Sequence, residues 1–390
     1  MPADRHLKIA ILGTRGVPAA YGGFETFAEE LGARLVERGH DVTAYGRSHV
    51  VPPGLRSHRG IRLRVLPTIH HKYLDTVVHT ALSVVDSLPR RFDVVLVCNN
   101  ANAPFALVPR LSGAHVALNV DGLEWERDKW GRAGRWYYQA CAWLSPRLPI
   151  VLISDARVIA AWYRERYGRA TVFIPYGSDA RRLPPGDTLR GLGLEPGRYV
   201  AYVTRFEPEN NPHLVIEGYR RAGGLAALGV PLVIVGDAPY ATDYKRSLEA
   251  AASETPGVML PGYVFGDGYV EIQSNAMLYV QATQVGGTHP ALVEAMGRGA
   301  CVLANDVPEL REVLGDAGVY YRRNDAADLA LQLGSLVRDP ERRRLLGVAA
   351  ADRAAVRFSW AHVTDAYEQL FLRMTARRRR AGNPPTEQGG

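Results

Sequence analysis

Short apolar segments alternate with amphipathic helical segments along this chain, and the whole pattern occurs twice. In the first half, strands are predicted at 8–13, 41–45, 61–66, 94–99, 114–120 and 149–153. Helices are predicted at 24–38, where Phe24, Phe27, Leu31 and Leu35 recur with helical spacing, and at 73–88. Because strands that are apolar on both faces belong in parallel sheets covered by helices, this pattern predicts an α/β fold.

The pattern restarts in the second half. Strands are predicted at 199–204, 231–235, 258–260, 277–281 and 301–305. Helices are predicted at 212–223, 240–254, 290–298, 307–315, 326–338, 341–357 and 358–373. Since 390 residues exceed one ordinary core, we expect two doubly wound, Rossmann-like domains facing across a cleft. The expected parts are a first domain (1–178), a Gly-, Pro- and Arg-rich linker (179–197), a second domain (198–357), a final helix (358–374) and a disordered basic tail (375–390).

Composition narrows the classes of protein. The hydrophobic fraction is 47% and the charged fraction 22%, as in soluble globular proteins. The longest apolar runs are strand-sized, and the N-terminus shows no signal-peptide core, so we expect a cytoplasmic protein. The cysteines, Cys98, Cys141 and Cys301, are far apart in apolar settings and are interpreted as buried small residues.

The net charge is unevenly distributed. Residues 1–185 contain 25 Lys and Arg against 16 Asp and Glu, giving +9, whereas residues 186–390 contain 22 against 24, giving −2. The first half is therefore expected to meet an anionic partner, such as membrane phospholipid, a pyrophosphate-bearing acceptor or nucleic acid. The alternative is a solvated basic surface. Because no basic stripe is interleaved with stacking aromatics, we predict no nucleic acid and instead peripheral association with the inner face of the plasma membrane.

Ligands of doubly wound sheets bind beyond the carboxyl ends of the strands, so the loops after strands are the candidates. The most informative loop is Gly286-Gly287-Thr288-His289-Pro290, which leads into a helix bearing Glu294. A Gly-Gly turn lets a ligand approach the backbone, and the first amides of a helix favour an anion. A carboxylate slightly further along can accept hydrogen bonds from sugar hydroxyls.

The loop after the first strand contains Gly22-Gly23 at the start of a helix, followed by Glu25. It lacks the Gly-x-Gly-x-x-Gly fingerprint of dinucleotide-binding folds. Bare amides at Gly22 and Gly23 could bind a diphosphate, although glycines before a helix are also ordinary turn residues.

Acids, bases and tryptophans are concentrated at 119–130, after another strand. Carboxylates accept hydrogen bonds from sugar hydroxyls, and aromatic rings stack on the faces of sugars. This segment is therefore a candidate sugar-binding site. Its alternative interpretation is the charged start of a helix. Asp121, Glu124 and Trp125 are the residues of interest here, and Glu25, Glu124 and Trp125 are the candidates to bind an acceptor.

Arg205 follows the first strand of the second half, and its planar guanidinium suits phosphate oxygens. The alternative is simple pairing with Glu207 or Glu209. The turns at 235–238 and 260–264 also follow strands and could line a pocket for a nucleotide base.

Taken together, these motifs resemble glycosyltransferase family 4 of the GT-B fold over about residues 7–374. The segments 11–26, 121–125, 207–211 and 286–290 resemble a narrower branch of bacterial rhamnosyltransferases of polysaccharide assembly. The resemblance implies a hexosyltransferase in which Glu294 holds the donor ribose and Arg205 and Gly22-Gly23 hold the diphosphate. The residues expected to bind the donor are Gly22, Gly23, Arg205, Asn210, Gly236, Gln284, Gly286, Gly287, Thr288 and Glu294.

The sequence departs from the family pattern in three ways. Gly286 stands where the wider family has a glutamate, and Gln284 stands where the branch places its acid. Asn210 and its neighbour replace a lysine, and Asp121 replaces a frequent histidine. These changes bear on the donor sugar and on the catalytic roles.

The implied reaction is retaining transfer of a sugar from a nucleoside diphosphate, with dTDP-rhamnose the first candidate and a UDP-sugar the second. The acceptor is expected to be a glycan or a lipid-linked molecule. Arg205 and Asp121 are the catalytic candidates, the latter to orient the acceptor. No cofactor or metal is expected, since the sequence has no Asp-x-Asp triplet and no His/Cys cluster. A nucleotide-sugar epimerase on the same fold and a non-catalytic nucleotide-sugar-binding protein are the alternatives.

Overall fold

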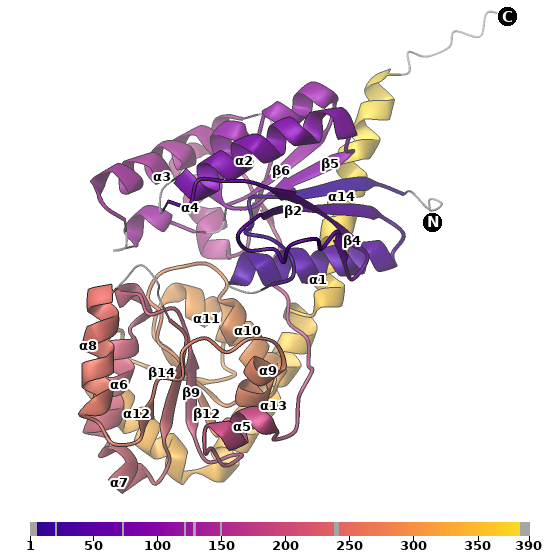
Figure 1. The fold of residues 1–390 in the computed structure, drawn as a ribbon. Helices are drawn as coiled ribbons and strands as arrows, with labels where there is room; N and C mark the ends of the chain where they lie inside the picture. The colour runs from indigo at the N-terminus through magenta and orange to yellow at the C-terminus, as the bar shows by residue number, and fades with distance from the viewer. Residues whose placement is uncertain are drawn as a thin grey trace, which may run out of the picture. The chain divides into compact units, whose positions relative to one another are not determined.

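The chain is organised as two compact units, described by a computed structural model that covers residues 6–19, 22–71, 74–120, 122–127, 130–148, 150–237 and 242–382, with side chains to residue 376. The first unit comprises residues 1–121, 136–175 and 360–390, and the second comprises 122–135 and 176–359 (Figure 1). The segment 122–135, expected in the first domain, thus packs with the second unit.

An eight-stranded sheet forms the centre of the first unit. Its strands are β1 (Lys8–Leu12), β2 (Asp41–Arg47), β3 (Ser57–His58), β4 (Ile61–Leu66), β5 (Val94–Val97), β6 (His115–Asn119), β7 (Val151–Ser154) and β8 (Val172–Phe173). Their order is β3-β4-β2-β1-β5-β6-β7-β8. All neighbours are parallel except the short β3, which is antiparallel to β4.

Helices cover both faces of this sheet. Alternate residues of β2 point to opposite sides: Val42 faces Gly32 of α1 (Gly23–Glu37), while the Tyr45 hydroxyl donates to Asp86 of α2 (Leu74–Ser87) at 3.0 Å. The sheet is therefore sandwiched between α1 and α2, as the apolar pattern predicts. Further helices of this part are α3 (Arg132–Leu144) and α4 (Arg157–Tyr167).

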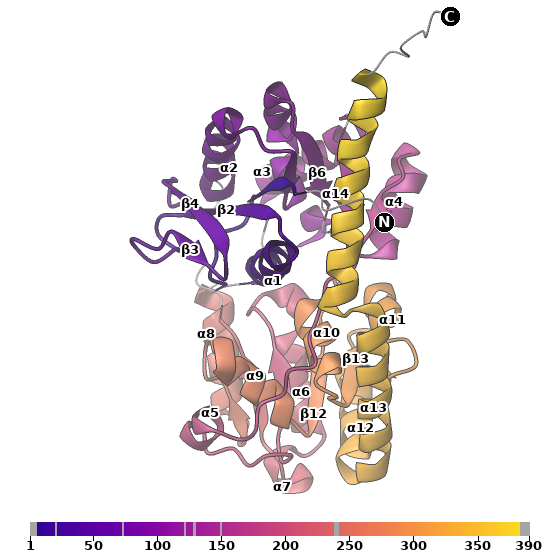
Figure 2. The same cartoon turned by 90° about the vertical axis from the view of Figure 1, so that its right-hand side faces the viewer.

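The last helix, α14 (Trp360–Gly382), belongs to the first unit although it follows the second in sequence. It packs along α1, where the Phe27 ring lies 5.4 Å from Tyr367 and Arg38 pairs with Glu368 at 2.7 Å (Figure 2). The helix continues to residue 382, past its predicted end at 374, because 375–382 consists mostly of Ala and Arg, which favour helix. Residues 383–390 of the predicted tail lie outside the described residues. No helix among those that are described is long and apolar enough to span a membrane.

A six-stranded, wholly parallel sheet forms the centre of the second unit. Its strands are β9 (Val200–Val203), β10 (Leu232–Val235), β11 (Val258–Met259), β12 (Leu278–Gln281), β13 (Val302–Asn305) and β14 (Val319–Tyr321). Their order is β11-β10-β9-β12-β13-β14. The chain runs outward from β9 to β11 and then crosses to β12, so the direction of winding reverses between β9 and β12.

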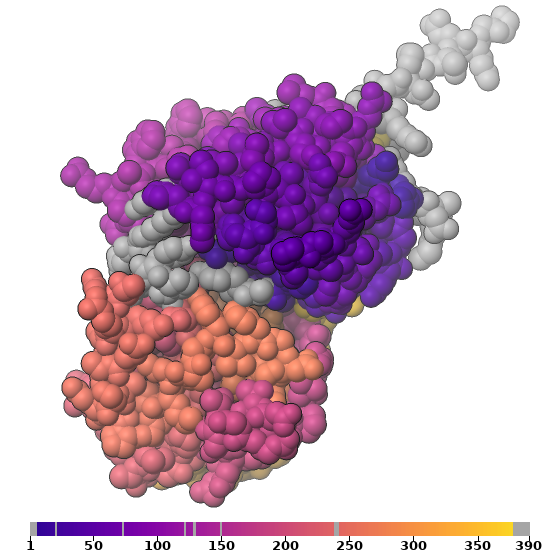
Figure 3. Space-filling model, in the orientation of Figure 1, coloured from indigo at the N-terminus to yellow at the C-terminus, as the bar shows by residue number. Residues whose placement is uncertain are grey.

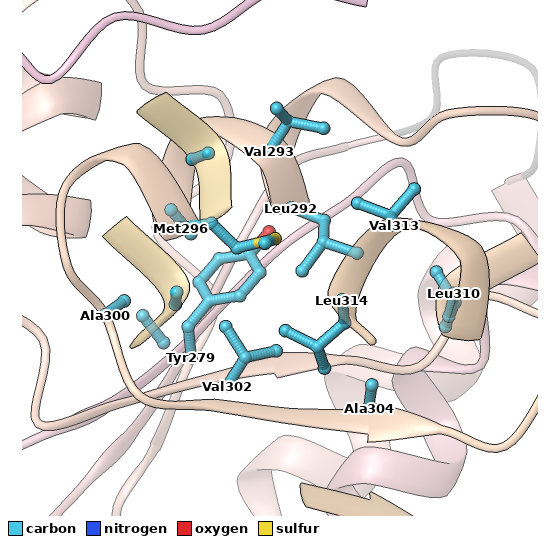
Figure 4. Close-up of a cluster of buried hydrophobic side chains, with 14 of the residues drawn as sticks. Tyr279, Leu292, Val293, Met296, Ala300, Val302, Ala304, Leu310, Val313 and Leu314 are labelled. Atoms are coloured by element: carbon cyan, nitrogen blue, oxygen red, sulfur yellow. The ribbon is translucent and has the colours of Figure 1, made fainter. Parts of the chain in front are cut away.

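Each face of this second sheet carries its own hydrophobic core. On one face Tyr279 and Val302 pack against Leu292 and Met296 of α10 (Pro290–Gly297), together with α11 (Pro308–Leu314) and α13 (Pro340–Arg357) (Figure 4). The other face packs against α6 (Pro212–Arg221), α8 (Thr242–Ser253) and α12 (Ala326–Arg338), with α7 (Gly224–Leu228) at its edge. These cores fix α10, and with it Glu294, relative to the strand ends.

Residues 179–197 are not a free linker, contrary to expectation. They contain the short helix α5 (Asp187–Gly191), and Leu189 and Leu194 are buried in the core of the second unit. The carboxylate of Glu271, on α9 (Gly266–Asn275), accepts hydrogen bonds from the backbone N–H groups of Gly186 and Leu189 at 2.7 and 2.8 Å. Two apolar anchors and one capping carboxylate thus help to hold a segment whose composition is that of a loop.

Candidate functional site

The point where the winding of the second sheet reverses is flanked by two loops, one after β9 and one after β12. They span residues 204–211 and 282–289. Strands that run apart on either side of such a point leave a crevice at their carboxyl ends, where ligands of doubly wound folds bind. Arg205 lies in the first loop and the Gly286–Thr288 turn in the second, so the structure brings these predicted residues together.

The turn at Gly286 can be formed only by glycine. Its φ is +148°, and a Cβ atom here would lie 2.8 Å from Cε1 of His289. A side chain would therefore be strained by the backbone and would clash with the imidazole. The space that a side chain at Gly286 would need is taken by His289.

We expect Gly286→Ala to lower the free energy of unfolding by about 1–3 kcal/mol, because alanine is strained at this φ and meets the imidazole. The measurement is thermal or urea unfolding. Gly191→Ala is the matched control, since Gly191 has ordinary backbone geometry and open space around it. Equal stability of Gly286→Ala and the wild type would show that the turn does not need glycine.

His289 is a site residue that the sequence did not single out. Its Nε2 atom is buried and makes no hydrogen bond among the described residues. Burial, reinforced by the charges of Arg127 and Arg205, lowers the pKa of His289 to about 3. The imidazole is therefore neutral at physiological pH, and it occupies the turn without adding charge.

Arg127 was likewise not predicted, although it lies in the acid-rich segment. Its Nε donates to Glu124 at 2.6 Å, and its NH1 lies 3.8 Å from carboxylate oxygens of both Glu207 and Glu209. A Cβ on Gly286 would come within 3.7 Å of its NH2 atom. Arg127 thereby ties the segment 122–127 to the loop after β9 and to the Gly286 turn.

Arg205 makes weaker contacts than Arg127, the other arginine near the turn. It lies 3.6 Å from Glu207, and 35% of its side chain is exposed. The ion pair between Arg205 and Glu207, which was the alternative interpretation of this arginine, is therefore present. Because a single contact of this length in a solvated setting is weak, the guanidinium can turn toward an incoming anion.

The residues expected to bind an acceptor are occupied by internal contacts. Glu124 is buried and accepts from Arg127 and from the indole N–H of Trp130 at 3.4 Å, and Trp125 is half-buried in the same segment. Glu25, in the first unit, is buried and accepts from the backbone N–H of Arg15 at 2.8 Å. Burial raises the pKa of Glu25 despite this hydrogen bond and the nearby Arg15 charge.

Glu294 lies within α10, held by two residues that sequence reasoning missed. Its Oε2 accepts a hydrogen bond from the Tyr269 hydroxyl and lies 3.8 Å from NH1 of Arg298. The Arg298 guanidinium is 5.3 Å from the centre of the Tyr269 ring and donates to Gln273. Burial and the Glu294 charge raise the pKa of Tyr269 well above 10, so its hydroxyl remains a donor. The carboxylate is thus oriented from α9 and from its own helix.

A network of asparagines fixes the loops next to Gln284. Asn324 donates from Nδ2 to Oε1 of Gln284 at 2.5 Å, and its own Oδ1 accepts from Asn211 and Asn305, each at 2.9 Å. The backbone N–H of Gln284 bonds the carbonyl of Glu209 at 3.0 Å. The side-chain oxygen of Gln284 thus accepts a hydrogen bond from Asn324, which orients the amide. The NH2 group of Gln284 is the part of the side chain that can donate to a ligand.

Two other predicted donor residues have visible structural roles. Asn210 is buried, and its side chain donates to the carbonyl of Arg205 at 2.9 Å, which shapes the loop that carries the arginine. Gly236 ends β10 with φ +145°, and a Cβ there would lie 1.7 Å from the carbonyl of Thr204. Both residues hold the site's loops together, and their contact with a ligand remains a prediction.

The remaining predicted residues belong to the first unit. Gly22 caps α1 and Gly23 is its first residue, so their amides are placed at a helix N-terminus as expected. Asp121 lies outside the described residues. Among those that are described, no group of three or more His, Cys, Asp or Glu side chains could hold a metal ion.

Two parts of the chain match known family models. Residues 197–339 match the model described as glycosyl transferases group 1, and residues 78–179 match a domain of unknown function, DUF1972. The match to the glycosyl transferases group 1 model lies within the second unit.

Two named relatives and one solved structure are similar to this chain. Alpha-maltose-1-phosphate synthase of Mycolicibacterium smegmatis is 31% identical over 53% of this chain and 55% of its own length. D-inositol 3-phosphate glycosyltransferase of Nocardia farcinica is 31% identical over 54% of this chain and 49% of its own length. The chain thus spans about half the length of these relatives. The crystal structure of Anabaena HepE with UDP and glucose has a TM-score of 0.76 at 17% identity, covering 94% of this chain and 99% of that one.

The fold predicted from the sequence is confirmed. Two doubly wound α/β units, built on a mostly parallel and a wholly parallel sheet, constitute the GT-B architecture, a fold that this chain shares with the HepE structure.

Proposed function

We propose that this protein is a retaining glycosyltransferase that moves a sugar from a nucleoside diphosphate to an acceptor hydroxyl. One observation supports the proposal: Arg205 and the Gly286–Thr288 turn lie in the two loops that flank the winding reversal of the second sheet, and Glu294 lies on α10, which follows the turn. The named relatives, which are a synthase of a sugar phosphate and a glycosyltransferase, support this class of activity.

The chemical demand of the reaction is to stabilise charge. As the bond between the anomeric carbon and the diphosphate breaks, negative charge grows on the leaving group and the sugar becomes cation-like. Arg205 and the backbone amides of Gly286–Thr288 are proposed to stabilise the diphosphate, with the amides of Gly22 and Gly23 adding to them. Glu294, held by Tyr269, is proposed to accept hydrogen bonds from the ribose.

Retention of the configuration at the anomeric carbon is proposed to follow from attack by the acceptor on the same face of the sugar from which the leaving group departs. The acceptor oxygen forms its bond to the anomeric carbon while the carbon–diphosphate bond breaks, and the acceptor proton passes to a diphosphate oxygen. Asp121 is proposed to orient the acceptor, and Glu25, Glu124 and Trp125 are the further candidates on the acceptor side. Since Glu25 and Glu124 already accept internal hydrogen bonds, we propose that they shape the acceptor side more than they bind sugar.

The proposed donor is dTDP-rhamnose, on the resemblance of the 286–290 motif to rhamnosyltransferases, and the proposed acceptor is a glycan or lipid-linked molecule of cell-surface polysaccharide. A UDP-sugar is the second candidate, because HepE was crystallised with UDP-glucose. Gln284 replaces an acid beside the donor sugar with a neutral amide whose NH2 group can donate. A sugar hydroxyl that donates a hydrogen bond to a carboxylate in other enzymes would here accept one from the NH2 group of Gln284. This change of hydrogen-bond direction is one way in which this chain can select its sugar.

A thermal-shift panel of dTDP-rhamnose, UDP-glucose and GDP-mannose tests the donor. A donor at 100 times its Kd should stabilise the protein by about 2.7 kcal/mol, and we expect the largest shift with dTDP-rhamnose. A larger shift with UDP-glucose would reassign the donor. No shift with any nucleotide sugar would refute the proposed function, and product formation without an acceptor would favour an epimerase.

A further inference from the structure

The outward face of α3 exposes two tryptophans. Trp136 is 70% exposed and Trp143 is 53% exposed, whereas tryptophan in folded proteins is on average highly buried. The two residues are seven positions apart, which is about two helical turns, so they share one face of the helix about 10 Å apart along its axis. In Figure 3 this helix lies at the surface of the first unit.

The opposite face of α3 is firmly attached to the rest of the protein. Tyr138 and Cys141 are buried, and the Tyr137 hydroxyl donates to the carbonyl of Ala101 at 2.8 Å. The helix therefore already has a hydrophobic contact on its inner side. Its exposed tryptophans are an additional apolar surface and not a core face turned outward.

Positive charge surrounds these tryptophans, and no acid lies near them in sequence. Between Asp128 and Asp155 the chain has no Asp or Glu, while Arg132 and Arg135 are exposed on the same helix. The Arg147 guanidinium lies 4.0 Å from the centre of the Trp143 ring, which is a cation–π contact. This combination of exposed indoles and arginines is typical of surfaces that lie at a membrane interface.

We propose that this face of α3, formed by Trp136, Trp143 and Arg147, docks on the surface of an anionic lipid bilayer. Indole rings partition to the headgroup region, where their apolar body and polar N–H are both accommodated, and each nearby arginine is attracted to anionic lipid. A second copy of the chain is a poorer occupant, because a self-complementary contact would place arginine against arginine with no acid in the helix to pair them.

The basic N-terminal half of the sequence already suggests an anionic partner, and α3 gives it a location. Docking through α3 needs no sugar donor, and Trp136, Trp143 and Arg147 all belong to the first unit. Such docking would hold the first unit at a surface where a lipid-linked acceptor resides. Binding to vesicles can nevertheless be measured whether or not the protein transfers a sugar.

Co-sedimentation with vesicles tests the proposal. We expect the wild type to bind vesicles of equal phosphatidylglycerol and phosphatidylcholine at low salt, and to bind pure phosphatidylcholine much less. Trp136→Ser with Trp143→Ser should weaken binding at least about ten-fold, while Trp136→Phe with Trp143→Phe should retain most of it. The matched control is Leu331→Ser with Val348→Ser, two residues 68% and 51% exposed on α12 and α13, which should bind like the wild type.

Three results would overturn the proposal. The first is that the wild type does not bind anionic vesicles. The second is that the wild type and the serine variant bind equally well and have the same melting temperature. The third is a concentration-dependent dimer, measured by light scattering, that the serine variant abolishes, because the face would then be an interface between two copies.

Discussion

Glu294→Ala is expected to weaken binding of the nucleotide donor about ten- to hundred-fold. A hydrogen bond to a charged group contributes roughly 1.5–3 kcal/mol, and the alanine variant loses the proposed bonds to the ribose hydroxyls. Isothermal titration with the donor that gives the largest thermal shift measures the effect. Unchanged affinity would refute the assignment of Glu294 to the ribose.

Stability must be separated from binding in this experiment. Glu294 lies 3.8 Å from Arg298, which is 5% exposed, so alanine leaves a buried cation with only Gln273 and the Tyr269 ring beside it. Removing one partner of a buried pair destabilises by about 3–5 kcal/mol. Glu294→Gln keeps the size of the side chain and should melt closer to the wild type, yet it should still lose donor affinity.

Tyr269→Phe distinguishes positioning from direct contact. The phenol oxygen orients the Glu294 carboxylate, so its loss should reduce donor affinity by less than Glu294→Gln does. A larger loss in Tyr269→Phe than in Glu294→Gln would assign the ribose contact to the tyrosine instead.

Arg205→Ala is expected to reduce kcat about 100- to 1,000-fold, which is the usual cost of removing one preorganised group that stabilises transition-state charge. The effect on kcat should exceed the effect on KM, because charge on the diphosphate grows as the bond breaks. Steady-state kinetics with a saturating donor measures it.

Arg205 is a favourable residue to test because 35% of its side chain is exposed and, among the described residues, its ion pair is the 3.6 Å contact with Glu207. Its removal should therefore leave the fold intact. Arg205→Lys keeps the charge but loses the planar fork, so it should recover part of kcat. Arg322→Ala removes one positive charge from the same unit at a side chain that is 72% exposed, and it should behave like the wild type. A decrease of equal size in both alanine variants would mean that only net charge matters.

Most strands could be predicted because they are short apolar runs, and most helices because their apolar residues recur with helical spacing, whereas β3, β8 and β14 were not predicted. The helix expected at 24–38 is α1 (Gly23–Glu37), and the helix expected at 307–315 is α11 (Pro308–Leu314). In both, one face is apolar and the other polar. The two-unit α/β architecture follows from that regularity alone.

Five α-helices of the described residues, α3, α4, α5, α7 and α9, escaped prediction. In α3 apolar residues occur on both faces, since Tyr138 and Cys141 are buried while Trp136 and Trp143 are exposed, and this hides the helical period. In α9 two glycines near its start, Gly266 and Gly268, disfavour helix. Contacts with the rest of the unit stabilise it, and α9 is the element that carries Tyr269 to Glu294.

The candidate site was partly predictable for a similar reason. Arg205 and the Gly286–Thr288 turn follow strands directly, so their place at the sheet edge follows from the order of the elements. Arg127 and His289 could not be found in this way. Their roles depend on how the segment 122–127 packs beside the turn, which involves contacts between residues more than 150 positions apart in the chain.

The claim that Glu294 holds the donor ribose is tested most directly by a double-mutant cycle with the ligand. The affinities of the best-binding nucleoside diphosphate and of its 3′-deoxy analogue are measured for the wild type and for Glu294→Gln by isothermal titration. We predict that removing the 3′-hydroxyl weakens binding to the wild type at least about ten-fold and barely changes binding to Glu294→Gln. An equal loss in both proteins would contradict the assignment and, with it, the proposed orientation of the donor in this site.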